Sequence, residues 1–105
     1  MKKVVSAALF CGSLFVSACA LAGLEEGLAA YRKGEFQVAL KEWLPLAEKG
    51  SADAQNNVGV LYEKGHGVPL DYVQAVQWYR RAAEQNHAQA QNNLGVMYEK
   101  GMGVK

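Results

Sequence analysis

The feature that most constrains this chain is an internal repeat. Residues 54–68 recur as residues 90–104, and the two copies differ at only three pairs of positions: Val58/Leu94, Leu61/Met97 and His66/Met102. An offset of 36 residues is typical of stacked supersecondary units, none of which can bury its apolar face alone. Repetition also argues against an enzyme, because a residue present in every copy usually serves packing.

The first 22 residues have the pattern of a signal peptide. Lys2 and Lys3 precede an apolar stretch over residues 4–16, and residues 20–22 supply the small-x-small pattern that a signal peptidase recognises. We therefore expect cleavage after Ala22. Polar residues and a glycine interrupt the apolar stretch, so we expect no membrane span after the leader is removed.

Lipidation is an alternative to simple cleavage. Residues 16–19 resemble a bacterial lipobox, in which Cys19 would be acylated and become the new N-terminus. Either route exports the chain. The predicted location is the periplasm or the outside of the cell, and the alternative is a lipid-anchored envelope protein.

The composition of the mature chain, residues 23–105, narrows its class. Both cysteines lie in the leader, so the exported domain must hold together by packing without disulfides. Without Lys2 and Lys3, nine basic side chains remain against ten acidic ones. This balance leaves no basic stripe suited to nucleic acid, and we expect no nucleic-acid partner.

Each repeat is predicted to contain two antiparallel helices. In the middle unit, the apolar periodicity and the capping residues predict helices over residues 51–64 and 71–85. Ser51 and Asp71 are the expected N-caps, and Gln74 would complete a capping box with Asp71. The residues expected to stop these helices in a left-handed conformation are Gly65 and Asn86.

Counting helices predicts an all-α fold of about two and a half repeats. A degenerate copy with a shorter loop precedes the middle unit, and a third copy contains only its first helix. The chain is therefore expected to form five helices arranged as antiparallel pairs.

The repeated residues resemble a known family. Residues 51–104 look like Sel1-like repeats, relatives of the tetratricopeptide repeat with a longer loop, on the strength of Ala54-Gln55, Gly59, Tyr62, Gly65-x-Gly67-Val68, Asp71, Ala75, Trp78-Tyr79 and Ala82-Ala83. The segment before them looks more like a tetratricopeptide unit. The predicted divisions are a signal peptide (1–22), a tetratricopeptide-like repeat (23–50), a Sel1-like repeat (51–86) and a partial Sel1-like repeat (87–105).

The resemblance implies a right-handed α-solenoid that acts as a non-catalytic scaffold or adaptor and binds other proteins or peptides. It implies no shared catalytic residue. One cysteine-rich branch of the family resembles β-lactamases in activity, and this chain departs from it because the mature part has no cysteine. A small envelope hydrolase acting on β-lactam or cell-wall substrates is the alternative.

The mature chain offers little for catalysis or metal binding. It has no cysteine, no threonine and one serine, Ser51, which the capping role explains. His66 lies in a glycine-flanked loop and His87 at a helix start, with no third ligand at a suitable spacing. We therefore predict no enzyme activity, no cofactor and no metal.

One set of repeated residues suggests a protein-binding face. At 100° per residue, three residues of the first helix in the middle unit point away from the predicted core, and each has a copy in the next unit. The candidate face consists of Asn56, Val60 and Glu63 with Asn92, Val96 and Glu99. Stacking would place the two sets side by side, where they could receive an extended peptide or a helix. The alternative is a solvated face that duplication copied.

The last helix is predicted to be incomplete on its own. Without a partner helix, Leu94, Met97 and Tyr98 would be left uncovered and would have to meet a second copy, a partner or a missing helix. Self-association through this helix is therefore one expectation. A fragment without independent function is another.

Overall fold

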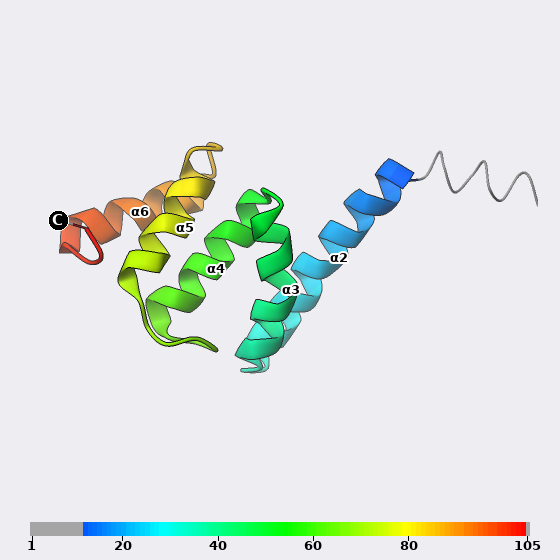
Figure 1. Cartoon of the computed structure of the whole chain (residues 1–105), viewed down its shortest axis with the longest axis horizontal. Coiled ribbons are helices and arrows are strands. Elements are labelled where there is room, and N and C mark those ends of the chain that lie inside the picture. The colour runs from blue at the N-terminus through cyan, green and yellow to red at the C-terminus, as the bar shows by residue number, and fades with distance from the viewer. Residues whose placement is uncertain (1–11, 105) are drawn as a thin grey trace, which may run out of the picture.

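The computed structural model describes residues 12–104, with side chains from residue 21 onward, and this part of the chain consists of five α-helices (Figure 1). The helices are α2 (Gly12–Arg32), α3 (Phe36–Glu48), α4 (Ala52–Lys64), α5 (Tyr72–Ala83) and α6 (Ala88–Lys100). Each helix packs chiefly against its neighbours in chain order. Such stacking of helix pairs is an α-solenoid, so the predicted all-α architecture is confirmed.

The predicted leader overlaps the start of this described region. Residues 1–11 lie outside it, and so does the side chain of Cys19, the alternative lipidation site. Helix α2 runs without interruption across the predicted cleavage junction between Ala22 and Gly23. Of the helices within residues 12–104, none is both long and apolar enough to cross a membrane.

Helix α4 begins and ends where its capping residues predict. The Ser51 hydroxyl accepts a hydrogen bond from the amide of Ala54 at 3.3 Å, which satisfies one of the free N–H groups of the first turn. Gly65 ends the helix in the left-handed conformation, with φ of 66°.

Helix α5 is capped in a simpler way than the sequence suggests. The Asp71 carboxylate accepts a hydrogen bond from the amide of Gln74 at 3.1 Å. The amide of Asp71 donates to the carbonyl of Tyr62 at 3.0 Å, so the reciprocal half of the capping box does not form. After the helix, Asn86 takes the predicted left-handed conformation, with φ of 64°.

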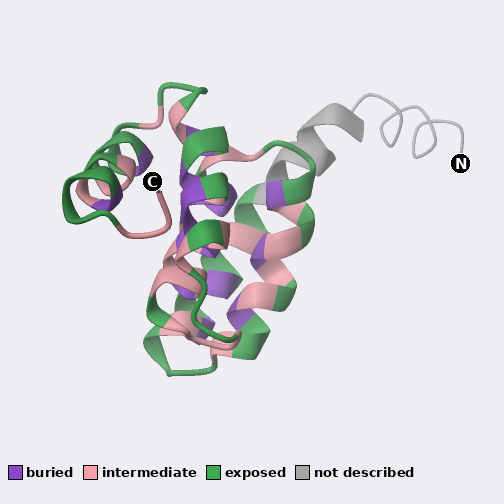
Figure 2. Ribbon diagram, turned by 60° about the vertical axis from the view of Figure 1, so that its left-hand side comes forward, coloured by how far each residue is buried: buried purple, intermediate pink, exposed green. Residues whose placement is uncertain are grey.

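Residues that are buried, purple on the ribbon of Figure 2, form two clusters along the solenoid. The first lies among α2, α3 and α4 and consists of Ala30, Ala39, Trp43, Ala47, Ala54, Val58 and Leu61. The second lies between α5 and α6 and consists of Ala75, Val76, Tyr79 and Met97. Each cluster joins one helix pair to the next, so no pair has a core of its own.

The expectation that the last helix leaves Met97 uncovered is wrong. Met97 is fully buried, and Leu94 is half-buried against the second cluster. The reason is that Met97 packs on Ala75, Val76 and Tyr79 of α5, and the turn after α6 adds Met102 and Val104 to the same cluster. Tyr98 is the one residue of the expected set that is exposed, at 50%.

The contact between α4 and α5 depends on an aromatic ring seated on a glycine. A Cβ atom added to Gly59 would lie 2.6 Å from two ring carbons of Tyr79. The Tyr79 hydroxyl donates a hydrogen bond to Glu63 Oε1 at 2.6 Å. Burial, together with this bond, raises the pKa of Tyr79 well above its ordinary value.

The same relation appears in the first pair of helices, where the ring of Trp43 lies against Gly27. The equivalent glycine in α6, Gly95, has no such contact. A Cβ atom added to Gly95 would meet no atom within 4 Å. Glycine is therefore required by packing at two of the three equivalent positions, and at the third the space is open.

A glutamine joins each repeat to the one before it. Gln55 in α4 donates through Nε2 to the carbonyl of Ala47 at the end of α3, at 3.1 Å. Gln91 in α6 donates in the same way to the carbonyl of Ala83 at the end of α5, at 3.2 Å. Each carbonyl lies in the last turn of a helix and also accepts a backbone amide from the turn that follows, from Gly50 at 3.1 Å and from Asn86 at 3.0 Å, so the glutamine adds a second bond that ties the next helix to it.

Substitutions at Gly59 and Gly95 should separate the effect of packing on stability from the effect of helix propensity. Gly59→Ala is expected to lower the free energy of unfolding by about 1–3 kcal/mol, because its methyl group overlaps the Tyr79 ring. Gly95→Ala is expected to raise it by roughly 0.5–1 kcal/mol, because alanine is the better helix former and its methyl group meets nothing. Urea denaturation followed by circular dichroism measures both. Equal effects of the two substitutions would contradict the seating of Tyr79 on Gly59.

Candidate protein-binding site

The three residues of the predicted face that belong to α4 are not exposed to solvent. Asn56 is only 6% exposed, and its Oδ1 accepts a hydrogen bond from Asn93 Nδ2 at 2.9 Å. Glu63 is half-buried beneath the Tyr79 hydroxyl, and Val60 packs against the second cluster. The prediction that these three residues point away from the core into open solvent is wrong.

The reason is the number of neighbours that α4 has. The prediction placed one core face on this helix and assumed solvent opposite it. In the stack, α4 packs against α3 on one side and α5 on another, and Asn93 of α6 reaches it as well. A helix in the middle of a solenoid therefore has little free surface.

The copies in α6 are more open. Asn92 and Glu99 are exposed, and Val96 is half-buried. Because their counterparts in α4 are covered, the six residues do not form one continuous surface. Whether the exposed ones bind a partner stays a prediction.

The loop that contains His66 serves packing. The His66 ring stacks on Phe36 with centroids 4.0 Å apart, and its Nδ1 lies 3.2 Å from the Tyr31 hydroxyl. Gly67, at φ of 77°, lets the loop approach the backbone of Phe36, where a Cβ atom would lie 2.9 Å from the carbonyl carbon. In the described residues, no group of three or more His, Cys, Asp or Glu side chains is arranged to hold a metal ion.

An open groove of about 350 Å³ lies where α2, α4 and the start of α6 meet. Its walls differ in character. Helix α2 contributes three leucines and a glutamate, and the other two helices contribute polar side chains. The lining residues are Leu21, Leu24, Glu25, Leu28, Asp53, Asn56, Asn57, His87 and Gln89. The groove therefore has an apolar wall and a polar wall.

The leucines of the apolar wall are unusually open for their type. Leu21 is 57% exposed and Leu28 is 40% exposed, which makes them two of the few large apolar side chains left in solvent. Leu24 is half-buried beside them. Apolar side chains gathered at the edge of a groove mark a surface suited to binding.

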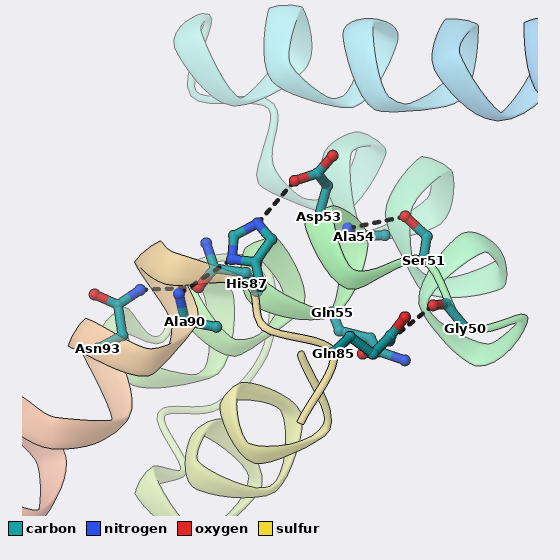
Figure 3. Close-up of polar contacts among 10 residues, drawn as sticks. Gly50, Ser51, Asp53, Ala54, Gln55, Gln85, His87, Ala90 and Asn93 are labelled. Atoms are coloured by element: carbon teal, nitrogen blue, oxygen red, sulfur yellow. Dashed lines mark hydrogen bonds and ion pairs between the residues drawn. The ribbon is translucent and has the colours of Figure 1, made fainter. Parts of the chain in front are cut away.

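His87 fixes the polar wall and at the same time caps α6 (Figure 3). Its Nδ1 lies 3.1 Å from the amide of Ala90 and must accept that hydrogen bond. The proton of the neutral ring is therefore on Nε2, which lies 2.7 Å from Asp53 Oδ1 and donates to it. One side chain thus caps a helix and joins two repeats.

A chain of amides continues this wall. Gln89 Nε2 donates to Asn93 Oδ1 at 3.2 Å, and Asn93 Nδ2 donates to Asn56 Oδ1 at 2.9 Å. These bonds fix the orientation of each amide. The wall is therefore organised before any partner arrives, which lowers the entropy lost on binding.

The polar lining of the groove offers hydrogen-bonding groups to a peptide. Its polar atoms are carboxylates, amides and one imidazole, which form hydrogen bonds to peptide groups. The Ser51 hydroxyl is outside its lining and already accepts the Ala54 amide. The arrangement suits a peptide segment with one apolar side and one polar side.

Sequence reasoning missed Asp53, Asn57, His87 and Gln89 as groove residues. Helical periodicity shows which side of a helix faces its partner, but it does not show which helices meet at an edge. One signal was available. His87 occupies the capping position of Ser51 in the preceding repeat, and the larger imidazole can reach a neighbouring repeat.

The double role of His87 can be tested by two substitutions. His87→Ala should lower the free energy of unfolding by about 1 kcal/mol, because α6 loses its cap. His87→Asn should recover most of that loss, because the asparagine oxygen can accept the Ala90 amide. Asp53→Asn serves as the control that leaves the cap in place. Equal destabilisation by alanine and asparagine in urea denaturation would show that the cap is not the important contact.

Comparisons with known proteins agree on one family. The Sel1 repeat matches residues 52–87 and 88–105. A Sel1 repeat protein from Oxalobacter formigenes is 40% identical, with a TM-score of 0.70, over 85% of this chain and 37% of that one.

A second solved structure has the same fold. The protein c5321, a protective antigen of uropathogenic Escherichia coli strains with an SLR fold, is 33% identical, with a TM-score of 0.72, over 90% of this chain and 20% of that one. The chain thus spans well under half the length of either structure. No curated protein matches it significantly. The repeat matches, the solenoid and the structural similarity together show that this chain belongs to the Sel1 repeat family.

Proposed function

We propose that this chain is a non-catalytic interaction module that binds an amphipathic segment of another protein in the groove between α2, α4 and the start of α6. Sel1 repeats generally mediate protein–protein interactions. The observation that carries the proposal is the pairing of exposed leucines on one wall with a fixed polar wall opposite.

The side chains of the two groove walls indicate which kind of partner segment would fit. Apolar side chains of the partner would lie on Leu24 and Leu28, and its polar groups would meet Asn57 and Gln89. Asp53, with 67% of its side chain exposed, favours a hydrogen-bond donor or a cation beside it. The partner is therefore a peptide or helix with apolar residues on one side and donor groups on the other.

The proposal favours binding over hydrolysis. Hydrolysis by a covalent route needs a nucleophile held next to a base. In the described residues from position 21 onward, the only hydroxyl of the serine type belongs to Ser51, which caps α4. The lining of the groove therefore holds no serine, threonine or cysteine to serve as the nucleophile of a covalent hydrolase.

The proposed location is the bacterial envelope or the outside of the cell. This rests on the signal-peptide pattern of residues 1–22. Cleavage after Ala22 would remove Leu21 and leave Leu24 and Leu28 as the apolar wall. Acylation of Cys19 would instead keep Leu21 and hold the groove close to a membrane surface.

Site-specific photo-crosslinking tests the groove. A photo-reactive amino acid at Leu28 or Gln89 is expected to trap the same partner in the exporting cell, and one at Gln77, on the exposed side of α5, is expected to trap none. Adding Leu28→Glu should reduce trapping at Gln89 at least tenfold without changing the melting temperature, because a charge replaces an apolar contact at a solvent-exposed site. Equal trapping at all three positions would contradict a groove-specific partner.

The intact mass of the exported protein tests its processing. A mature chain that begins at Gly23 is the expected result, and an acylated chain that begins at Cys19 would support the alternative. A chain that retains residues 1–22 in the cytoplasm would overturn the proposed location. This measurement is independent of the crosslinking, so either can fail alone.

A further inference from the structure

The charged groups of the groove are carboxylates. Among the residues that line it, Glu25 and Asp53 are acidic, one on each wall, and none is a lysine or an arginine. The remaining titratable residue of the lining, His87, is held to Ala90 and Asp53 by hydrogen bonds that use its neutral ring. The groove therefore presents negative charge beside an apolar wall.

The basic side chains of the three helices that form the groove lie far from these carboxylates. Helices α2, α4 and α6 carry theirs in the last turn, as Arg32, Lys64 and Lys100. At 1.5 Å per residue, Lys64 lies about 16 Å along the helix from Asp53, and Arg32 lies about 10 Å from Glu25. Both separations exceed the Debye length of about 8 Å at physiological ionic strength. These helices thus do not neutralise the charge of the groove.

Both carboxylates have oxygens available to a cation. The one ion pair within residues 21–104 joins Asp53 Oδ1 to His87 Nε2 at 2.7 Å. In Figure 3 the dashed line to His87 leaves one oxygen of Asp53, and the other oxygen points away from it. Glu25 is exposed and has no ion pair in this part of the chain. A cation that enters the groove can therefore contact both residues.

A nearly buried amide also lines the groove. Asn56 is 6% exposed, and its Oδ1 accepts the hydrogen bond from Asn93. Its Nδ2 makes no hydrogen bond with the residues that the structure describes. Since no fully enclosed side-chain nitrogen or oxygen among those residues lacks a partner, this Nδ2 atom is open to the groove. It is a fixed donor for an acceptor that the occupant brings.

The size of the groove limits what can enter it. Its volume of about 350 Å³ lies near the lower end of the range of ligand pockets, roughly 300–1,000 Å³. An α-helix with its side chains is about 10 Å across. The groove therefore has room for one or two side chains and a short stretch of backbone, but not for the full width of a helix.

We propose that the groove holds an arginine side chain from an extended segment of the partner protein. This inference rests on the interaction function proposed above and specifies the partner. The aliphatic stem of the arginine lies on Leu24 and Leu28, and its guanidinium group lies between Asp53 and Glu25. A backbone carbonyl next to the arginine accepts the hydrogen bond from Asn56 Nδ2.

Arginine suits this site better than lysine. The planar guanidinium group has five N–H donors and can bond to two carboxylates at once, whereas the ammonium group of lysine acts as a point charge. The guanidinium group is also less strongly hydrated, so placing it beside leucines costs less desolvation.

An extended backbone follows from the free donor on Asn56. The carbonyls of a helix already accept hydrogen bonds within that helix, except in its last turn. In an extended segment the carbonyls beside the arginine are free, and one of them can accept from Nδ2. Side chains two residues apart also point to the same side, so apolar residues at those positions reach the leucine wall.

The probe is the short peptide acetyl-Ala-Leu-Ala-Arg-Ala-Leu-Ala-amide. Its matched control carries citrulline, which keeps the shape of arginine and removes the charge. Binding of each peptide to the isotope-labelled full chain would be measured by NMR titration. The arginine peptide is expected to bind about tenfold more tightly than the citrulline peptide, on the scale of a hydrogen bond to a charged group, and to shift the side-chain amide resonances of Asn56. A lysine peptide is expected to bind with intermediate affinity.

Three conservative substitutions locate the cation. Asp53→Asn and Glu25→Gln should each weaken the arginine peptide about tenfold and leave the citrulline peptide unchanged. Glu99→Gln is the matched control, because it removes the same charge from an exposed residue outside the groove, and it should change neither peptide. All three side chains are exposed, so the melting temperatures should stay the same.

The other outcomes overturn the inference. Equal affinity for arginine and citrulline would show that the groove binds peptides without selecting a cation, which leaves the proposed interaction function standing. Equal affinity for lysine and arginine would exclude selection of the guanidinium group. Weakening by Glu99→Gln as large as that by Asp53→Asn would indicate attraction to the overall charge. A chain that binds none of the peptides, while crosslinking at Leu28 and Gln89 still traps a partner, would overturn the arginine contact alone.

Discussion

The solenoid depends on the close approach of two helices at a glycine. Because Gly59 has no side chain, Tyr79 can lie directly on the backbone of α4 and place its hydroxyl on Glu63. The ring belongs to the second cluster, whereas α4 also contributes to the first, so this contact connects the two. Trp43 on Gly27 gives the first pair of helices an equivalent contact. The spacing of helices within each pair therefore follows from one small residue and one large ring.

Most of the fold could be predicted from the sequence, because local interactions determine it. Ser51, Asp71, Gly65 and Asn86 mark the ends of helices through bonds and dihedral angles that involve only nearby residues. The repeat then predicts that each unit packs like the last. The burial of Met97 follows from the same repetition, because its copy Leu61 is also fully buried against the preceding repeat.

The candidate site could be predicted far less well. The sequence predicts correctly that Asn56 and Glu63 lie on one helix. Their surroundings, however, depend on α6, which contacts Asn56, and on α5, which contacts Glu63. The groove depends on where α2 lies relative to α4 and α6, and no spacing within one helix reports that position. Helical periodicity describes a face relative to one partner, whereas the free surface of a solenoid depends on all of them.

The paired glutamine bonds have a consequence for how such chains change in length. Gln55 and Gln91 each reach back eight residues to a carbonyl of the preceding repeat, so this bond at each junction joins residues that are close in the sequence. A gene that gains or loses one whole unit of 36 residues keeps these junctions intact, since the new neighbours supply the same donor and acceptor. Duplication of a unit thus preserves this bond at the seam, which helps natural selection to lengthen the array.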